Sequence, residues 1–298
     1  MKSILINRKP VQGPWGGGNL FVASFCEAFR QQGYRVVHAF EPNLDYVFMQ
    51  DPRPDALGIS VNEIAAYKSE NPKVKVLHRV NECDARKGTS GLDDFLRECS
   101  KITDHTIFVS NWMREYHTSK GWLCPNTSVV YNGVNLEHFK QQPKFCNGKI
   151  NIVTHHWSDN PLKGADIHQF LDELAGKDDR FTFTYIGRCG YELPNTRIIA
   201  PLCGESLGAE LGKYDVYVSG SRFDPGPNHI IESLACGLPT YTHIDGGGAA
   251  EFAGGSHTYK NTEELIALLL KSSQNSHFSP IPWDRCMRKV QLILEAIK

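Results

Sequence analysis

The sequence has no hydrophobic run of membrane-spanning length, no pair of cysteines in a C-x-x-C spacing and no block of basic residues. A helix that crosses a membrane needs about 20 apolar residues, so only contact with a membrane surface stays open. The first residues, MKSILINRKP, contain too short an apolar stretch for the core of a signal peptide. Together these absences predict a soluble, cytoplasmic protein.

The charge and the reactive side chains exclude further classes of function. Lys and Arg number 32 against 33 Asp and Glu, a formal net charge of -1, which leaves no electrostatic footprint for a nucleic acid. Nine scattered cysteines, an odd number, are typical of reduced thiols inside a cell. The pair His155 and His156 lacks the H-E-x-x-H or Cys/His spacing of a zinc site. We therefore expect neither a metal nor a cofactor.

Short apolar runs alternate with helical patterns along almost the whole chain, which is typical of parallel sheets covered by helices on both faces. A chain of 298 residues can bury two cores, and the polar stretch 141–149 is the best candidate linker. The sequence predicts an α/β protein of two Rossmann-like domains, residues 1–143 and 144–280, with a cleft between them.

The expected strands cover residues 4–6, 35–39, 46–49, 56–59, 75–79, 106–109 and 128–131 in the first domain, and 150–154, 181–186, 197–199, 215–218 and 240–242 in the second. A final amphipathic helix is predicted over 281–298, with Val290, Ile293 and Ile297 on one stripe. This helix could cap the second domain or cross back onto the first.

The segment 221–239, SRFDPGPNHIIESLACGLP, contains the most informative pattern in the chain. Asp224 and Glu232 lie eight positions apart around a turn that should lead into a helix. The preceding prolines stop that helix from extending backwards, and Asn228 is a good N-cap, so a helix is predicted from Asn228 to Gly237. The N–H groups and partial positive charge of its first turn favour a phosphate or a sugar. The segment therefore predicts a ligand site.

Other polar or glycine-rich clusters also follow predicted strands, where open parallel sheets bind their ligands. The loop GPWGGGN at 13–19 would let backbone approach a ligand closely, and HRVNECDARK at 78–87 is densely charged. THHWS at 154–158 leads to Lys163, a cation at a helix N-terminus that is unfavourable unless an anion joins it. A glycine turn at 246–248 precedes another expected helix.

Each cluster also has a purely structural interpretation, as a tight turn, a solvated charged loop or a pair of packed histidines. The glycine loop does not spell G-x-G-x-x-G, and no acidic residue follows the second strand before Glu41, which argues against a nicotinamide-dependent dehydrogenase. The convergence of all the clusters at strand ends favours one ligand site over several unrelated loops.

The chain resembles the retaining glycosyltransferases of family 4, the glycosyl transferases group 1 type, which have the GT-B fold. The segments NIVTHHWSDNPLKG, FTYIGR and DPGPNHIIESLACGLPTYTHIDGGGAAEF are similar to the family's donor-binding half. Weaker similarity lies in GPWGGGN, HRVNECD, FVSNWMREYH and VVYNGVNLEHF, so the likeness spans most of the chain.

The resemblance implies a role for each matching residue. Glu232 would hold the nucleotide ribose, Asp224 would contact the transferred sugar, and Lys163 would neutralise the diphosphate. His78 would lie over the sugar from the first domain, so the implied catalytic residues are Asp224, His78 and Lys163. The remaining donor-binding positions are Gly17, Gly18, Arg79, Ser158, Arg188, Asn228, His229, Ile230, Gly247 and Gly248.

Two positions depart from the family's pattern. Asp224 stands where the family usually has Glu, which shortens the side chain by one methylene. Ser158 stands where an arginine is often found, five residues before Lys163. The arginines that could replace it on the diphosphate are Arg79, Arg188 and Arg222.

The resemblance implies transfer of a sugar, with retention of configuration, from a nucleotide sugar to a carbohydrate or other hydroxyl acceptor. A UDP- or GDP-sugar is the favoured donor. The sequence lacks a D-x-D carboxylate pair, which favours a mechanism without metal. Two alternatives stay open: a degraded GT-B domain that only binds a nucleotide or glycan, and a sugar-nucleotide epimerase.

Overall fold

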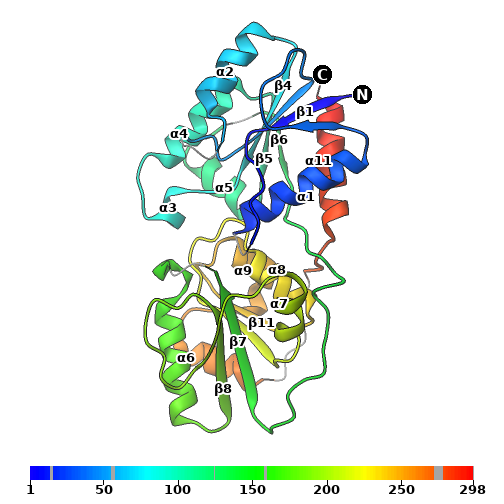
Figure 1. The fold of residues 1–298 in the computed structure, drawn as a ribbon. Helices are drawn as coiled ribbons and strands as arrows, with labels where there is room; N and C mark the ends of the chain where they lie inside the picture. The colour runs from blue at the N-terminus through cyan, green and yellow to red at the C-terminus, as the bar shows by residue number, and fades with distance from the viewer. Residues whose placement is uncertain (14–15, 55–57, 124, 158–159, 272–277, 298) are drawn as a thin grey trace. The chain divides into compact units, whose positions relative to one another are not determined.

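The computed structural model of the chain describes residues 1–13, 16–54, 58–123, 125–157, 160–271 and 278–297. Its internal contacts divide into two compact units (Figure 1). Unit 1 consists of Met1–Asn132 together with Trp283–Lys298, and unit 2 of Gly133–Pro282. Each unit contains one six-stranded sheet, and the strands within both sheets pair in parallel. The predicted α/β class is therefore confirmed.

The sheet of unit 1 has the order β2-β1-β3-β4-β5-β6. The three strands β1, β3 and β4 are buried along almost their whole length, because helices cover both faces of the sheet. The strand bounds are β1 Ser3–Ile6, β2 Arg35–Val37, β3 Tyr46–Gln50, β4 Lys75–Val80, β5 His105–Phe108 and β6 Thr127–Val129. The helices are α1 Gly17–Gln31, α2 Val61–Glu70, α3 Asp84–Lys87, α4 Leu92–Cys99, α5 Asn111–Ser119 and α11 Trp283–Ala296, with a 3-10 turn η1 at Ser100–Ile102.

Helices α1 and α11 lie side by side in unit 1, although most of the chain separates them in sequence (Figure 1). The aromatic side chains Phe21, Phe25 and Phe29 of α1 are buried, and the rings of Phe25 and Phe29 are stacked with their centroids 4.1 Å apart. The Trp283 ring lies 6.2 Å from that of Phe21. The buried face of α11 is not the predicted stripe, since only Val290 of the three predicted residues is fully buried. The other buried residues of α11 are Cys286, Met287, Gln291 and Leu294.

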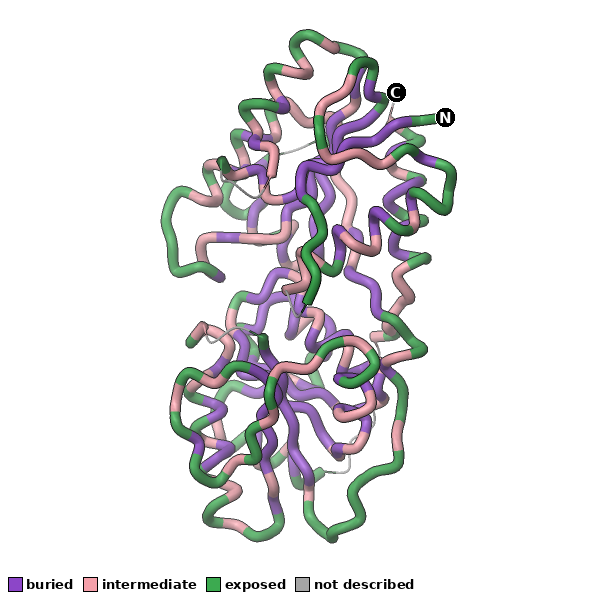
Figure 2. Tube along the Cα trace, viewed as in Figure 1, coloured by how far each residue is buried: buried purple, intermediate pink, exposed green. Residues whose placement is uncertain are grey.

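The sheet of unit 2 has the order β12-β11-β10-β7-β8-β9. Its strands are β7 Ile150–His156, β8 Phe181–Gly187, β9 Arg197–Ile199, β10 Val216–Ser219, β11 Thr240–His243 and β12 Thr258–Tyr259. The helices are α6 Ala165–Lys177, α7 Gly204–Leu211, α8 Asn228–Ala235, α9 Gly248–Ala253 and α10 Thr262–Leu269, with 3-10 turns η2 at Pro161–Lys163 and η3 at Gly255–His257. The burial colours of Figure 2 show strands of both sheets as the interior of their units.

Most predicted strand ends lie within two residues of the observed ones, and larger differences occur at three points. Residues 133–143 belong to unit 2, whereas the sequence placed the end of the first domain at 143. The strand expected at 56–59 lies partly outside the described residues, and Gly58 forms only an isolated bridge with Arg8. Strand β12 was not predicted, because two residues are too few for a periodic pattern.

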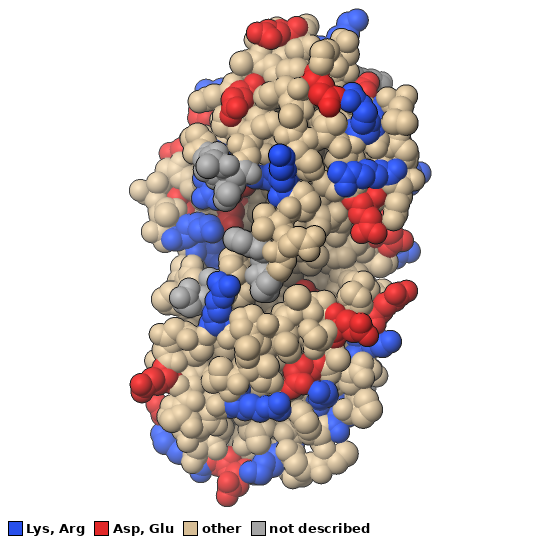
Figure 3. Space-filling view, viewed as in Figure 1, with Lys and Arg blue, Asp and Glu red and all other residues tan. Residues whose placement is uncertain are grey.

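Two surface properties complete the description. None of the helices within the described ranges combines the length and apolarity that crossing a membrane requires. On the face shown in Figure 3, basic and acidic side chains are interspersed, in keeping with the net charge of -1.

Candidate functional site

The strand order of unit 2 identifies the edge of the sheet at which a ligand is expected. Strands β7 and β10 are neighbours, and from them the chain continues toward opposite sides of the sheet, to β8 on one side and to β11 on the other. In open α/β sheets, ligands bind at the carboxyl ends of the strands beside such a switch point. The loop after β7 carries Lys163 and the loop after β10 carries Asp224. Two residues predicted from the sequence thus share the expected place.

Lys163 and Asp224 form an ion pair. Lys163 Nζ donates to Asp224 Oδ2 at 2.9 Å. The exposed fraction of the side chain is 20% for Lys163 and 8% for Asp224. A partly buried pair interacts more strongly than a surface pair, because little water screens it. The pair places one cation and one carboxylate together at the carboxyl ends of β7 and β10.

The main chain of Asp224 is paired with the glycine turn that precedes α9. Asp224 N donates to Gly246 O at 3.0 Å, and Gly248 N donates to Asp224 O at 2.8 Å. Gly247 has φ +68° and ψ −125°, which favours glycine, and a Cβ on Gly248 would lie 2.7 Å from Pro225 O. The predicted donor positions Gly247 and Gly248 therefore lie beside Asp224, where only glycine allows the two loops to approach.

Glu232 lies at the same edge and is held by His155, the penultimate residue of β7. His155 Nε2 and Glu232 Oε2 are 2.8 Å apart, and both side chains are almost buried, with 10% and 13% exposed. The edge of the imidazole fixes the position of the carboxylate, which leaves its second oxygen for another partner. The sequence suggested His155 only as a packed residue, and nothing in the spacing indicated a contact across 77 positions.

Helix α8 begins at Asn228, but Asn228 is not the N-cap that the sequence predicted. Pro227 occupies the N-cap position, and no side chain caps the helix there. The helix ends at Ala235, followed by Gly237 with φ +70°. His229 is buried and its Nε2 lies 2.9 Å from Ser219 Oγ, which anchors the first turn of α8 to the end of β10. Ile230 is fully buried, so it offers its main chain rather than its side chain.

Histidines gather in the core beneath this edge. The ring centroids of His156 and His229 are 4.8 Å apart, and those of His156 and His168 are 5.5 Å apart. His168 Nδ1 forms a hydrogen bond with Tyr191 OH. Burial lowers the pKa of His168 to about 3 and that of His156 well below its ordinary value, so both rings are neutral at pH 7.

Because these buried histidines are neutral, we expect the free energy of unfolding to decrease in acid. Since burial depresses the folded-state pKa, protons bind the unfolded chain first, and stability falls as pH drops below the unfolded value of about 6.5. Each such histidine should remove about 2 kcal/mol from the free energy of unfolding between pH 6.5 and pH 5. His168→Phe should reduce that loss by one histidine's share, as measured by urea unfolding at pH 7 and pH 5. Equal pH dependence in both proteins would contradict this assignment.

The arginines proposed for the diphosphate are placed differently from one another. Arg188 follows β8, and its guanidinium carbon lies 5.8 Å from the centroid of the partly exposed Trp157 ring. Arg222 pairs with Asp166 at 2.9 Å. Ser158 lies outside the described residues. Of these arginines in unit 2, Arg188 is thus the one whose described contacts include no carboxylate, which leaves its charge available for an anion.

Arg79 is buried inside unit 1, with 1% of its surface exposed. Its guanidinium donates to Gln50 Oε1 at 3.1 Å and to Asn132 Oδ1 at 2.6 Å, and stacks on Phe21 at 3.9 Å. Burial lowers its pKa to about 10. These contacts make Arg79 a supporting residue, in contrast to the diphosphate contact that the sequence suggested.

Arg79 still connects to the predicted glycine loop. Gln50, which accepts from Arg79, donates through Nε2 to Gly18 O at 2.9 Å. A Cβ on Gly18 would lie 3.2 Å from that same nitrogen, and Gly17 is the first residue of α1. The first turn of α1, which contains both glycines, is therefore fixed by a buried cation through one glutamine.

His78 is fully buried on β4, and its ring centroid lies 6.4 Å from that of Trp122. Burial lowers its pKa to about 3. Neither ring nitrogen has a hydrogen-bond partner in the described part of the chain. A role over the sugar stays a prediction, since the ring is surrounded by unit 1 core.

Among the described residues, no group of three or more His, Cys, Asp or Glu side chains has an arrangement that could hold a metal ion. The polar groups assembled at the edge of unit 2 are one lysine, two carboxylates and the glycine turn at 246–248. Their chemistry suits a ligand that carries both an anion and hydroxyl groups.

No family model matches the sequence, and no curated protein matches it either. Solved structures match over nearly the whole chain. Anabaena HepE in complex with UDP and glucose has a TM-score of 0.72 at 12% identity, covering 99% of this chain and 100% of HepE. The sucrose-phosphate synthase of Thermosynechococcus elongatus has a TM-score of 0.62 at 15% identity, covering 100% of this chain and 95% of its own. WaaG, a glycosyltransferase involved in lipopolysaccharide biosynthesis, has a TM-score of 0.59 at 12% identity, covering 98% and 92%.

The chain has the GT-B fold. Identities of 12% to 15% establish this architecture and no more than that. Within the GT-B chain, the polar groups described above lie at the switch point of the second sheet.

Proposed function

We propose that the protein is a retaining glycosyltransferase that moves a sugar from a nucleotide-sugar donor to a hydroxyl acceptor without a metal ion. The observation that carries the proposal is the Lys163–Asp224 pair at the switch point of unit 2, with Glu232 held at the same edge. The GT-B fold supports it, because the similar structures include a named glycosyltransferase and HepE bound to UDP and glucose. A UDP-sugar is accordingly the first donor to test.

The charges of the reaction match the charges of the site. As the bond between the sugar and the diphosphate breaks, negative charge develops on the leaving phosphate and positive charge on the sugar ring. Lys163 and the N-terminal turn of α8 oppose the negative charge, since preorganised cations and N–H groups need no rearrangement during the reaction. Asp224 would bind sugar hydroxyls and oppose the positive charge, and Glu232 would accept from the ribose hydroxyls.

Retention of configuration requires the acceptor to approach the anomeric carbon from the same face of the sugar ring as the one the leaving group leaves. We assign no protein base, so the acceptor hydroxyl would pass its proton to a departing phosphate oxygen while its own oxygen bonds to the anomeric carbon. An acceptor analogue bound with its hydroxyl far from the diphosphate oxygens in a ternary complex would exclude this route.

Donor binding is the direct test. Thermal unfolding should be measured with UDP, GDP, ADP, dTDP and their sugar conjugates, first with EDTA and then with magnesium. A ligand at about 100 times its dissociation constant should stabilise the protein by roughly 2.7 kcal/mol. A clear shift with one nucleotide in EDTA supports the proposal, whereas no shift with any nucleotide for the folded protein contradicts it.

A second candidate is a GT-B module that binds a nucleotide or glycan without turnover, or one that epimerises the donor. The shortened carboxylate at Asp224, already engaged by Lys163, is the observation that favours reduced catalysis. Release of nucleoside diphosphate and epimerisation of the donor sugar, both followed with and without acceptor, separate the three. A transferase releases nucleoside diphosphate when the acceptor is present, an epimerase converts the donor to its epimer without acceptor, and a binding module does neither.

Nucleotide affinity should depend on the bond from His155 to Glu232. His155→Leu removes the donor and should weaken UDP binding about tenfold, because a hydrogen bond to a charged group contributes about 1.5 kcal/mol. His155→Gln retains an N–H donor and should lose less. Calorimetric titration of the three proteins with UDP measures this order, and equal affinity of the Leu variant and the natural protein would exclude a positioning role.

A further inference from the structure

One histidine supports the turn that precedes α9. We call residues 244–248 the Asp224 turn, because their main chain pairs with that of Asp224. His243, the last residue of β11, lies directly before this turn, and its side chain is 10% exposed. Asp245 N donates to His243 Nδ1 at 3.1 Å, and His243 Nε2 lies 3.3 Å from Lys260 O. The ring therefore connects the Asp224 turn to the chain that follows β12.

The two partners determine the protonation state of the His243 ring. The amide of Asp245 can only donate, so Nδ1 must carry a lone pair. The carbonyl of Lys260 can only accept, so Nε2 must carry the hydrogen. His243 thus supports the turn as a neutral imidazole of one defined tautomer. A proton on Nδ1 would replace the acceptor by a second donor and break the hydrogen bond from Asp245 N.

The Asp224 turn fixes the main chain on both sides of the Phe223–Asp224 peptide bond. Asp245 O accepts from Phe223 N at 2.8 Å, and Gly246 O accepts from Asp224 N at 3.0 Å. Phe223 has φ +51°, a conformation that costs a bulky residue about 1 to 3 kcal/mol. Such a residue keeps its conformation only while its surroundings impose it. The hydrogen bond from Asp245 to His243 therefore helps to set the position of Asp224.

Another acceptor for a protonated ring lies close to His243. Asp245 Oδ2 is 3.6 Å from His243 Nδ1, and the Asp245 side chain is 60% exposed, which leaves it room to rotate. A protonated Nδ1 would donate to this carboxylate, while the amide of the same residue loses its acceptor. Protonation would thus exchange a main-chain contact of Asp245 for a side-chain contact.

Charged and titratable groups of several elements face the His243 ring. Burial, followed by the charge of Arg222 in the loop after β10, lowers the pKa of His243. The groups that act in the opposite direction are Asp245, the carbonyl of Lys260, and Asp166 in α6. The ring of Tyr259 in β12 packs edge-on with its centroid 5.6 Å away, and is uncharged because burial raises its pKa. His243 is therefore neutral at pH 7 and gains a proton only below its ordinary value of about 6.5.

We propose that His243 is a positioning residue of the transfer site, which holds Asp224 through the Asp224 turn while its ring is neutral and releases the turn when Nδ1 is protonated. This inference rests on the proposed function, since Asp224 affects turnover only if the protein is a transferase. The described hydrogen bonds of the ring are to Asp245 and Lys260, so His243 acts on the reaction through Asp224. Mild acid should accordingly slow turnover through a residue outside the reacting groups.

Hydrogen exchange of the full-length protein without ligand tests the positioning role. Three proteins are compared at pH 7: the natural one, His243→Leu and His243→Asn. Leucine removes the acceptor, so the amides of residues 223–224 and 245–248 should exchange about fivefold faster, because a hydrogen bond contributes about 1 kcal/mol. Asparagine places an oxygen two residues before the amide of Asp245, a common turn arrangement, and should restore slow exchange.

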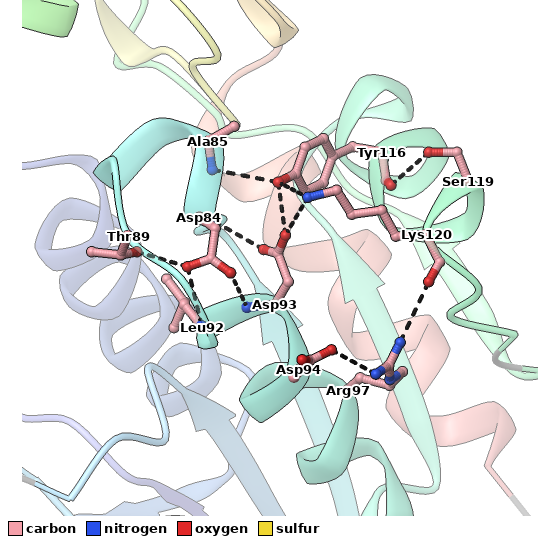
Figure 4. A network of polar contacts seen from close by, with 10 residues as sticks. All are labelled: Asp84, Ala85, Thr89, Leu92, Asp93, Asp94, Arg97, Tyr116, Ser119 and Lys120. Atoms are coloured by element: carbon pink, nitrogen blue, oxygen red, sulfur yellow. Dashed lines mark hydrogen bonds and ion pairs between the residues drawn. The ribbon is translucent and has the colours of Figure 1, made fainter.

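Segment 84–93 of unit 1 is the internal reference, because side chains also bind its amides (Figure 4). Asp93 N donates to Asp84 Oδ2 at 2.9 Å, and Asp84 N donates to Asp93 Oδ1 at 2.9 Å. These two bonds involve no histidine, so the exchange of this segment should be equal in the three proteins. Equal acceleration here and in the Asp224 turn would show a general loss of stability and overturn the local role.

The dependence of kcat on pH tests the effect of the proton. It is measured from pH 7.5 to 5.5 with saturating donor and acceptor, while circular dichroism verifies the fold. The kcat of the natural protein should fall by up to about fivefold more than that of His243→Asn, which keeps the acceptor but gains no proton. His243→Leu should have about one fifth of the natural kcat at pH 7.5 and no such additional fall.

His105→Asn is the matched control for acid effects on another histidine. His105 lies in unit 1 at the start of β5, and burial lowers its pKa as well. Its Nε2 is 3.0 Å from Ser128 Oγ, on the neighbouring strand β6. The variant should therefore keep the pH profile of the natural protein.

Three results would overturn the inference: equal exchange of the Asp224 turn in the natural protein and His243→Leu, an unchanged kcat profile in His243→Asn, or a protonated Nδ1 at pH 7. The last is read from the ¹⁵N chemical shifts of the ring in the natural protein, which needs no variant to fold. Absence of turnover in every protein would instead contradict the proposed function. The exchange experiment uses no substrate, so it separates the two failures.

Discussion

Lys163→Gln is expected to lower the rate of nucleoside diphosphate release by about 10² to 10³-fold while the protein stays folded. Removing one preorganised group that opposes developing charge costs this much in enzymes of comparable chemistry. In this chain Lys163 Nζ lies 2.9 Å from Asp224 Oδ2, and only 20% of the lysine side chain is exposed. Steady-state kinetics with saturating donor and acceptor measure the effect.

The matched control is Lys177→Gln, on the helix that follows Lys163. Lys177 pairs with Glu173 on the surface, where both side chains are well exposed, so its loss should leave the rate within twofold. Lys163→Gln also leaves Asp224 without its lysine, and the double variant with Asp224→Asn should recover stability but not turnover. A rate for Lys163→Gln within fivefold of the natural protein would refute the assignment of Lys163 to the diphosphate.

Gly164→Ala is expected to destabilise the protein by about 4 kcal/mol or more, lowering the melting temperature by roughly 10 °C. Gly164 has φ +103°, which strains any other residue. A Cβ there would also lie 2.4 Å from the Cα of Gly220, in the loop after β10. Because the obstacle is backbone rather than a flexible side chain, the two loops of the switch point would have to separate.

Gly148→Ala isolates the strain from the contact. Gly148 lies in the same unit with φ +72°, but a Cβ added there would meet no atom within 4 Å. Gly148→Ala should lower the free energy of unfolding by only about 1 kcal/mol. Chemical unfolding of the two variants measures the difference. Similar losses in both would mean that the approach of Gly164 to Gly220 is not tightly packed.

The fold was predictable because short apolar runs in parallel sheets alternate visibly with helices. Strand β9, at Arg197–Ile199, was predicted with its observed bounds, although two of its residues are exposed. The C-terminal helix was predicted, but its buried face was not. Packing against α1 turns Leu294 inward in place of Ile293, and a partner element distant in sequence determines that rotation.

The site was predictable where a residue type matches a topological position. Lys163 and Asp224 follow two strands, and strand ends can be read from the sequence. The hydrogen bond between His155 and Glu232 could not be predicted, because no local sequence pattern connects residues that are 77 positions apart. The sequence suggested Arg79 as a ligand of the diphosphate, but Arg79 lies on a strand that is covered on both faces. There its guanidinium donates hydrogen bonds to Gln50 and Asn132 inside the unit.

The place of α11 in unit 1 has a consequence for biosynthesis. Unit 2 is one continuous stretch, whereas unit 1 contains Met1–Asn132 and a helix that follows the whole of unit 2. At about 5 to 20 residues per second, a ribosome needs roughly 10 to 30 s to make the residues in between. Until then the aromatic face around Phe21 lacks Trp283, and Tyr34 lacks Glu295. The half that is synthesised first should therefore be the half that completes its folding last, with its apolar surface open to chaperones in the interval.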